Sequence, residues 1–263
     1  MINNKEKYIE HINDNSQILV MRKVLDKVER VLDYHKVEYT DFLDPYQRRL
    51  CYSFLNRFLE IKYFEEGGYN NSERKSIVIF PHYLTKYNID NPVKVLKVKY
   101  SSDYTDLNHR DYLGALMSLG IKREKVGDII VSENFGEIIL LDEIKDFVLF
   151  SLDSIAKERV EVNEIALSDI VKPKVETKEI YTTVASLRAD NIISSAHNIS
   201  RSDSSTYVKS KKVKVNWEPI TEPSYEINEG DMISLKKKGR VIVKKVLGLS
   251  RKGRIKLILE KLL

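Results

Sequence analysis

Apolar positions near the start of the chain recur every three or four residues, the spacing of one face of an α-helix. One such stripe predicts a helix of about 20 residues and consists of Ile18, Met21, Val24, Leu25, Val28, Val31 and Leu32. Asp44 and Pro45 predict the start of a further helix, because aspartate caps free amides and proline needs no donor in the first turn. We therefore expect residues 5–58 to be largely helical.

Shorter apolar stretches follow, and they predict alternating strands and helices. Two of them, residues 61–64 and 76–80, flank Gly67-Gly68 and predict a hairpin with a long polar connection. Strands are then expected at residues 93–100, 128–131, 137–141 and 160–166, and helices at residues 108–119 and 142–157. This order is that of a ferredoxin-like or RRM-like domain. The strand at 137–141 holds no aromatic side chain, so the usual base-stacking platform of an RNA-binding RRM is expected to be missing.

A polar segment around Lys172-Pro173-Lys174 has no apolar period and indicates a linker. Beyond it we expect a helix at residues 184–196 and a second helix from Ser200 to about residue 210, because Ser200 and Asp203 can satisfy free amides at a helix start. Strands are expected at residues 213–216, 232–235, 239–246 and 254–259. The fold class is therefore predicted to be α+β, with a helical N-terminal region (1–75), an RRM-like middle domain (76–170), a linker (171–180) and a C-terminal domain (181–263).

Charge is distributed unevenly along the chain. The overall net charge is +5, but residues 181–263 carry 17 Lys and Arg against 8 Asp and Glu, a net charge of +9. Residues 1–180 carry 27 against 31, a net charge of −4. A basic end on a mildly acidic body predicts a polyanion-binding module, since nucleic acid recognition depends first on neutralising phosphates.

Other classes of chemistry find little support in the composition. The single cysteine, Cys51, cannot form an intramolecular disulfide or a thiol-rich metal site, and the five histidines lack metal-ligand spacing. We therefore expect no cofactor, no metal and no catalytic residue. No apolar run approaches 18 residues, so we expect a cytoplasmic protein without a membrane partner.

The candidate RNA-binding residues lie in the basic C-terminal region. Arg188 and Arg201 rank first because a guanidinium matches phosphate with a planar fork; the alternative is an Arg188 paired with Asp190. The remaining candidates are Ser200, Ser202, Lys209, Lys211, Lys212, Lys214 and Asn216. The two serines can equally be helix caps, the lysines solvated surface, and Asn216 a residue that holds a turn.

These residues fall in a pattern that resembles the S-four-type RNA-binding domain, also called the alpha-L motif. The matching segments are Arg188-Ala189-Asp190, Ser200-Arg201-Ser202, Val213-Lys214-Val215-Asn216 and Gly230-Asp231-Met232-Ile233. Two positions depart from the family pattern: Lys211 stands where glycine is usual, and Ala189 where leucine is usual. A left-handed lysine at 211 would cost about 1 kcal/mol relative to glycine, so either the turn differs or the extra cation offsets that cost at the RNA.

A longer resemblance, to bacterial YlmH-type proteins, covers nearly the whole chain. It is carried by residues 107–130, which begin Leu-Asn-His-Arg-Asp-Tyr-Leu-Gly, and by Leu43-Asp44-Pro45, Gly67-Gly68-Tyr69 and Glu73-Arg74-Lys75. The resemblance implies a non-enzymatic RNA-binding factor that acts on the large ribosomal subunit and is linked to rescue of stalled translation. The leading prediction is a monomer that binds rRNA or tRNA through residues 181–263. A division-linked adaptor that uses the acidic N-terminal part is the alternative, and an RNA-modifying enzyme with an appended RNA-binding domain is a less favoured one.

Overall fold

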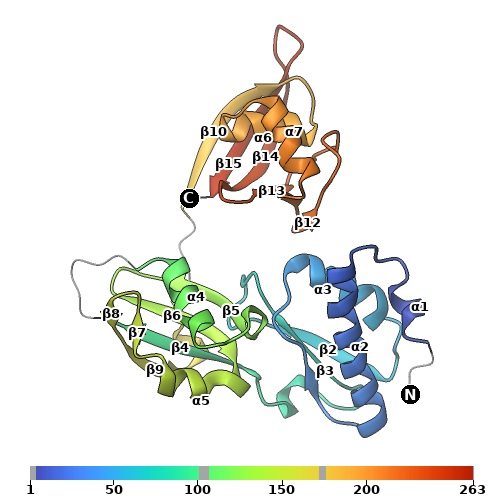
Figure 1. Cartoon of the computed structure of the whole chain (residues 1–263). Helices are drawn as coiled ribbons and strands as arrows, with labels where there is room; N and C mark the ends of the chain where they lie inside the picture. The colour runs from blue at the N-terminus through green and yellow to red at the C-terminus, as the bar shows by residue number, and fades with distance from the viewer. Residues whose placement is uncertain (1–3, 101–106, 172–175, 263) are drawn as a thin grey trace. The chain divides into compact units, whose positions relative to one another are not determined.

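The chain forms two compact units, Met1–Pro173 and Lys174–Leu263, in a computed structural model that describes residues 4–100, 107–171 and 176–262 (Figure 1). Both units combine helices with antiparallel sheets, so the predicted α+β class is confirmed. Each unit has its own hydrophobic core.

The N-terminal part packs three helices on a small sheet. The helices are α1 (Glu6–Ile9), α2 (Asn15–Tyr34) and α3 (Pro45–Leu55), and the sheet has the order β1-β3-β2, with β1 (Glu38–Tyr39), β2 (Ile61–Glu66) and β3 (Ser76–Pro81). The apolar stripe of α2 faces the core as predicted: five of its seven residues are buried, and Ile18 and Leu32 are partly buried against them. Asp44 and Gln47 form a capping box at the start of α3, where Pro45 occupies the first turn. The expectation of a largely helical 5–58 needs one correction, because β1 interrupts it to pair with β3.

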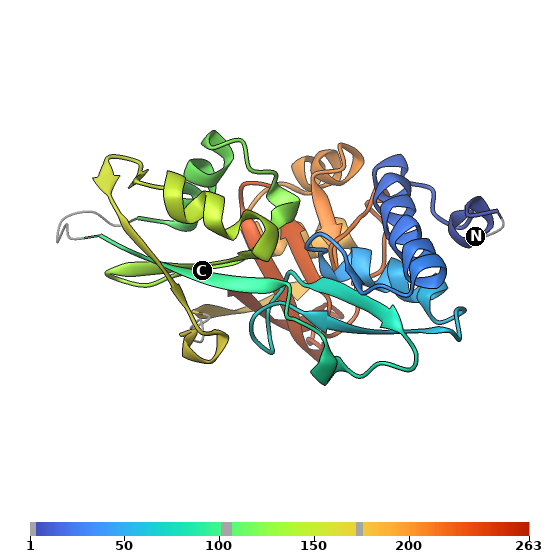
Figure 2. The same ribbon diagram turned by 90° about the horizontal axis from the view of Figure 1, so that it is seen from below.

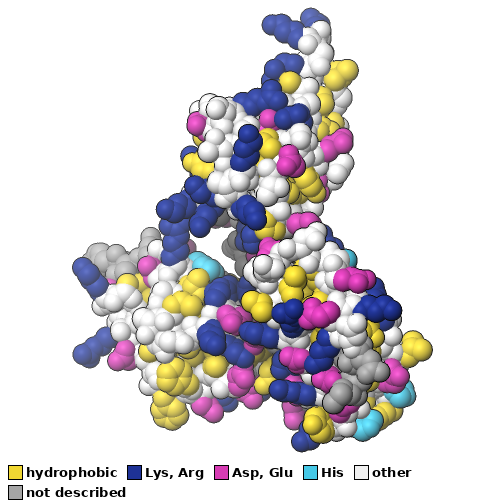
Figure 3. Space-filling view, turned by 45° about the vertical axis from the view of Figure 1, so that its right-hand side comes forward, with side chains coloured by type: hydrophobic (Ala, Val, Ile, Leu, Met, Phe, Trp, Pro, Cys, Tyr) yellow, Lys and Arg dark blue, Asp and Glu magenta, His cyan; other side chains and the backbone are white. Residues whose placement is uncertain are grey.

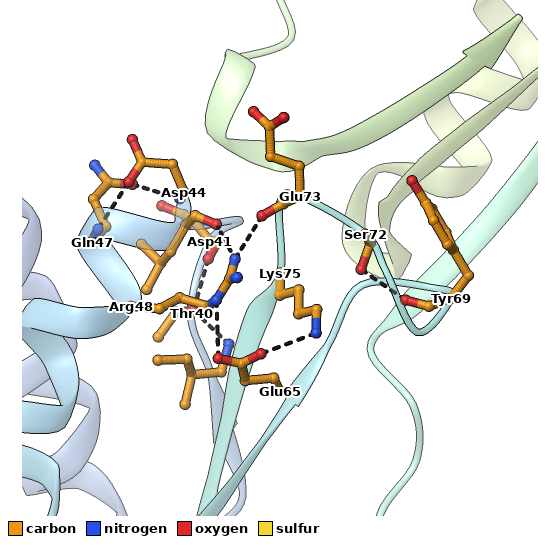
Figure 4. Close-up of polar contacts among 12 residues, drawn as sticks. Thr40, Asp41, Asp44, Gln47, Arg48, Glu65, Tyr69, Ser72, Glu73 and Lys75 are labelled. Atoms are coloured by element: carbon orange, nitrogen blue, oxygen red, sulfur yellow. Dashed lines mark hydrogen bonds and ion pairs between the residues drawn. The ribbon is translucent and has the colours of Figure 1, made fainter. Parts of the chain in front are cut away.

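A polar network fixes the segment between β2 and β3 against α3 (Figure 4). The Arg48 guanidinium donates to Glu65 Oε1 at 3.0 Å and to the carbonyl of Glu73 at 2.7 Å. Lys75 Nζ lies 3.1 Å from Glu65 Oε2. Arg48 and Lys75 thus both bind the Glu65 carboxylate. These contacts anchor both ends of the loop that contains Gly67 and Gly68.

The middle part is a four-stranded sheet with the order β5-β6-β4-β9, in which every neighbouring pair is antiparallel. Its elements are β4 (Val93–Lys99), α4 (His109–Ser118), β5 (Val126–Val131), β6 (Phe135–Leu141), α5 (Asp142–Ser151) and β9 (Glu161–Ile165). This order agrees with the predicted ferredoxin-like arrangement. The helix expected to run to residue 157 ends at Ser151, because β7 (Ser154–Ile155) and β8 (Glu158–Arg159) form a separate ribbon.

The two faces of this sheet are covered differently. Helices α4 and α5 lie on the same face (Figure 2), where Leu96, Ile138 and Leu140 are buried. On the opposite face Val95 and Ile139 pack with Phe42, which comes from the N-terminal part. The surface on which an RRM would stack bases is thus partly occupied by the protein itself.

Asp128 ties the N-terminal and middle parts together. Its carboxylate accepts hydrogen bonds from the Tyr69 hydroxyl at 2.8 Å and from the backbone amides of Glu73 and Arg74 at 2.7 and 3.1 Å. The boundary expected between residues 75 and 76 does not match this architecture. Since β3 pairs with β1 and β2, the N-terminal sheet continues to Pro81.

The C-terminal unit packs two helices on a six-stranded antiparallel sheet with the order β10-β15-β14-β13-β11-β12. Its elements are β10 (Thr177–Val184), α6 (Ala189–His197), α7 (Arg201–Lys209), β11 (Val213–Val215), β12 (Glu218–Pro219), β13 (Met232–Leu235), β14 (Gly239–Leu249) and β15 (Ile255–Leu262). Two expectations are corrected here. Residues 177–180 of the expected linker belong to strand β10, and the helix expected from residue 184 begins at Ala189. Residues 172–175 of that linker lie outside the described residues.

Candidate nucleic-acid interface

Asp190 holds the two leading candidate arginines on one carboxylate. The Arg188 guanidinium donates to both carboxylate oxygens, with Nε and Nη2 each 3.1 Å from an oxygen, and Arg201 Nε donates to Oδ2 at 3.1 Å. The Asp190 side chain is 3% exposed, whereas those of Arg188 and Arg201 are 40% and 57% exposed. The pairing of Arg188 with Asp190 was foreseen as an alternative, but it leaves both arginines at the surface.

The charge of this trio favours an anion. Burial opposes ionisation of Asp190, but hydrogen bonds from Arg188 and Arg201 outweigh it, so the pKa of the carboxyl lies below its ordinary value. Two guanidinium groups against one carboxylate leave a net charge of +1. The Asp190 contacts occupy two of the five N–H donors on Arg188 and one of those on Arg201, so donors remain that can reach a phosphate.

Backbone contacts set the direction of α6 and thereby place Asp190. The amide of Ala189 donates to the carbonyl of Tyr225 at 2.8 Å, and that of Asp190 donates to the carbonyl of Pro223 at 3.1 Å. The first amides of α6 are therefore satisfied by a neighbouring loop. Because the helix start is fixed and the Asp190 side chain is buried, the carboxylate is a rigid anchor for both arginines.

Ser200 acts as the N-cap of α7. Its hydroxyl accepts a hydrogen bond from the amide of Asp203 at 3.0 Å, as the sequence predicted. Ser202 is exposed in the first turn of α7, next to Arg201. The cap explains Ser200 structurally, and it places Arg201 at a helix start, where free amides and the helix dipole favour an anion.

The end of α7 carries several exposed lysines around a left-handed residue. Lys211 has φ 56°, and the amides of Lys211 and Lys212 donate to the carbonyls of Val208 and Tyr207 at 2.9 and 3.0 Å. These two bonds define a Schellman motif, which usually places glycine at the left-handed position. Of the two alternatives for Lys211, a different turn or a left-handed lysine, the structure shows the left-handed lysine. Lys209, Lys211 and Lys214 are exposed, and Lys212 Nζ lies 5.7 Å from the centre of the Tyr207 ring.

Asn216 holds a tight hairpin between β11 and β12. Asn216 and Trp217 both have positive φ, at 48° and 67°, as the two central residues of a type I′ turn require. The Asn216 amide group donates to Asp231 Oδ1 at 2.7 Å, and its carbonyl oxygen accepts from the amide of Met232 at 3.0 Å. These contacts show that Asn216 holds the turn, which is one of the two roles considered for it.

A second basic turn lies beside the end of α7. The amide of Lys236 donates to the carbonyl of Lys212 at 3.0 Å, so the turn between β13 and β14 adjoins the Schellman motif. Lys236, Lys237 and Lys238 in this turn are all exposed. We call Lys209, Lys211, Lys212 and Lys236–Lys238 the lysine cluster. Lys and Arg side chains are spread over the visible face of the C-terminal unit in Figure 3.

Nearby groups differ in what they add to this surface. Arg254, in the β14–β15 hairpin, donates to the Thr183 carbonyl at 2.7 Å and to its hydroxyl at 3.1 Å. His197 adds no positive charge at neutral pH, because burial and then Lys261 and Lys238 lower its pKa to about 4. The sequence alone did not indicate that Asp190 also pairs with Arg201, since the two residues belong to different helices.

The described part of the chain contains no group of three or more His, Cys, Asp or Glu side chains arranged to hold a metal ion. None of its helices combines the length and apolar character that a membrane span needs.

Comparison with known proteins identifies the family to which the chain belongs. Residues 16–84 match the model described as "YlmH, N-terminal", residues 87–169 the one described as "Putative RNA-binding domain in YlmH", and residues 187–233 the S4 domain. The Bacillus subtilis (strain 168) protein named "Ribosome-associated protein quality control protein P2" is 36% identical over 231 residues, or 88% of this chain and 90% of that protein. The structure titled "Cell division protein ylmH from Streptococcus pneumoniae" covers 61% of this chain and 97% of its own at a TM-score of 0.53, and at 19% identity it shows likeness of fold alone. The resemblances found in the motifs are thereby confirmed, and the chain belongs to the YlmH family.

Proposed function

We propose that this protein is a ribosome-associated RNA-binding factor that contacts rRNA or tRNA through its C-terminal unit. The observation that carries the proposal is the pair of exposed arginines held on the buried Asp190. Such a fixed pair of guanidinium groups can bind a phosphate without first being ordered, which lowers the entropic cost of binding. The lysine cluster adds further exposed positive charge at the end of α7.

A more specific role is suggested by the name of the Bacillus subtilis relative. We propose that the protein acts on the large ribosomal subunit in quality control of stalled translation, because a relative that covers most of the chain is named for ribosome-associated quality control. We also propose that it works in the cytoplasm, as a monomer, and by binding rather than by catalysis. The proposed RNA-binding residues are Arg188, Ser200, Arg201, Ser202, Lys209, Lys211, Lys212, Lys214 and Asn216. Ser200 and Asn216 also shape the surface, as a helix cap and a turn residue.

The double variant Arg188→Ala/Arg201→Ala tests this function. Charge-assisted hydrogen bonds contribute roughly 1.5–3 kcal/mol each, so RNA affinity and co-sedimentation with large ribosomal subunits should fall at least about tenfold. The slope of log affinity against log salt should become shallower by about 2, because each lost phosphate contact contributes about 0.9.

Two matched variants separate geometry from charge. Arg22→Ala/Arg30→Ala removes the same charge from α2 and should leave RNA binding nearly unchanged. Arg188→Lys/Arg201→Lys keeps the charge but removes the planar fork, and it should bind with intermediate affinity. Equal binding by the wild type and the Arg188→Ala/Arg201→Ala variant at moderate salt would rule out this interface.

A further inference from the structure

The outer face of α5 combines two exposed phenylalanines with three acids. Phe147 is 50% exposed and Phe150 is 91% exposed, while Val148 on the opposite side is fully buried. Residues three apart on a helix share one face, so both rings are presented to solvent from the same side of α5. The other exposed residues of this helix are Asp142, Glu143 and Asp146. We call these five residues the α5 surface.

The α5 surface lies in an acidic part of the chain. Residues 142–170 carry 8 Asp and Glu against 3 Lys and Arg, a net charge of −5 in a protein whose overall charge is +5. The lysine within α5, Lys145, is only partly exposed, and its Nζ lies 3.1 Å from Glu164 and 3.4 Å from Asp146. Lys145 is therefore paired with these acids, and Lys125 Nζ lies 2.5 Å from Glu143 Oε1. The acidic character of the segment comes from the excess of its acids over its lysines and arginines.

Exposed rings of this size indicate an interaction surface. Aromatic side chains are enriched at protein interfaces, and two exposed neighbours can serve as anchors for a partner. Their acidic surroundings restrict what that partner can be. A nucleic acid would bring phosphates against Asp142, Glu143 and Asp146, and the repulsion would oppose binding. A second copy meeting this face through a two-fold axis would place like charges together.

We propose that the α5 surface docks a basic segment of a ribosomal protein, one with apolar side chains that cover Phe147 and Phe150. This inference rests on the proposed ribosome association. On a ribosome, the protein segments that lie among phosphates are those rich in Lys and Arg, since these residues neutralise RNA. The C-terminal unit binds RNA, and the α5 surface binds the cationic protein beside it. The two surfaces of opposite charge then recognise the two components of one particle.

Photocrosslinking on the full-length protein tests the identity of the partner. Phe150 is replaced by photoreactive benzoylphenylalanine, and the protein is irradiated with purified large ribosomal subunits. Tyr87, which is 87% exposed, receives the same group as a control. We expect a product from position 150 that survives ribonuclease and contains a ribosomal protein, at several times the yield from position 87. A product with RNA, a product with a second copy, or no product from a co-sedimenting protein would each overturn the proposal.

Binding measurements separate this inference from the proposed function. The variant Phe147→Ser/Phe150→Ser should bind large subunits about tenfold more weakly than the wild type, and Asp146→Lys should also bind more weakly. Both variants should bind protein-free rRNA as tightly as the wild type does. Tyr87→Ser should change neither affinity, and thermal unfolding checks that all three variants are folded. Unchanged subunit binding by the phenylalanine variant would overturn the docking proposal, whereas a wild-type protein that failed to bind either particle would overturn the proposed function as well.

Discussion

At Lys211, backbone conformation and charge make opposite demands on the side chain. Its left-handed conformation, with φ 56°, suits glycine, whereas a positive charge beside Lys209 and Lys212 suits a phosphate. We expect Lys211→Gly to raise the free energy of unfolding by about 1 kcal/mol and to make the salt dependence of RNA binding shallower by about one contact.

Lys211→Ala separates these two demands. Alanine keeps the strained conformation but lacks the charge, so it should lose the RNA contact without gaining stability. Urea unfolding and RNA titration at several salt concentrations measure both effects. If the glycine and alanine variants are equally stable, the left-handed conformation at this position carries no strain that glycine relieves.

Replacing Asp190 tests whether RNA binding depends on the positions of Arg188 and Arg201 or only on the net charge of the C-terminal unit. Asp190→Asn makes the C-terminal unit more positive, so electrostatics alone predicts tighter RNA binding. We expect binding at least about fivefold weaker instead, because the arginines lose the anchor that holds them 3.1 Å from its carboxylate. The loss of charged hydrogen bonds should also lower the free energy of unfolding by about 1–3 kcal/mol.

The exposed Asp203, in the first turn of α7, offers the matched control for this experiment. Asp203→Asn changes the net charge by the same amount near the same surface, and it should leave RNA affinity unchanged or slightly higher. Fluorescence anisotropy with labelled RNA compares the two variants. Tighter binding by both would mean that Asp190 has no positioning role.

At the scale of elements, α4 packs on β6 through a contact that only glycine permits. A Cβ at Gly136 would lie 2.4 Å from ring carbons of Tyr112, which is fully buried. Gly136→Ala should therefore lower the free energy of unfolding of the N-terminal unit by about 1–3 kcal/mol or more. Gly114→Ala, on α4 with open space around it, should be neutral or stabilising by up to about 1 kcal/mol. Urea unfolding followed by circular dichroism distinguishes the two, and equal stabilities would contradict the packing.

The elements that the sequence predicted are those with a strong local signal. The apolar stripe of α2, the capping residues Asp44 and Ser200, and the strand–helix order of the middle domain required no knowledge of distant contacts. Strand β10 was missed because most of its residues are polar and exposed, and its pairing with β15 joins residues far apart in the sequence. For the same reason the two arginines could be proposed, but their common anchor on Asp190 could not.

At the scale of the whole molecule, charge and core divide the chain in the same way. The buried residues of one hydrophobic cluster all lie between Val184 and Leu259, and those of the others lie between Ile9 and Ile155. The basic residues that we assign to RNA binding belong to the C-terminal unit, and the acidic α5 surface belongs to the N-terminal unit. A chain with separate cores can lose one unit while the other stays folded.

The single tryptophan, Trp217, makes this independence measurable, because it reports on the C-terminal unit alone. In urea, circular dichroism should follow two transitions, and tryptophan fluorescence should follow only one of them. A ligand that binds only the folded state stabilises the unit that holds it, so RNA should raise the midpoint of the fluorescence transition and leave the other midpoint in place. Gly136→Ala should have the converse effect, lowering the transition that fluorescence does not detect. A single coincident transition in the wild type, shifted as a whole by RNA, would show instead that the two units fold as one.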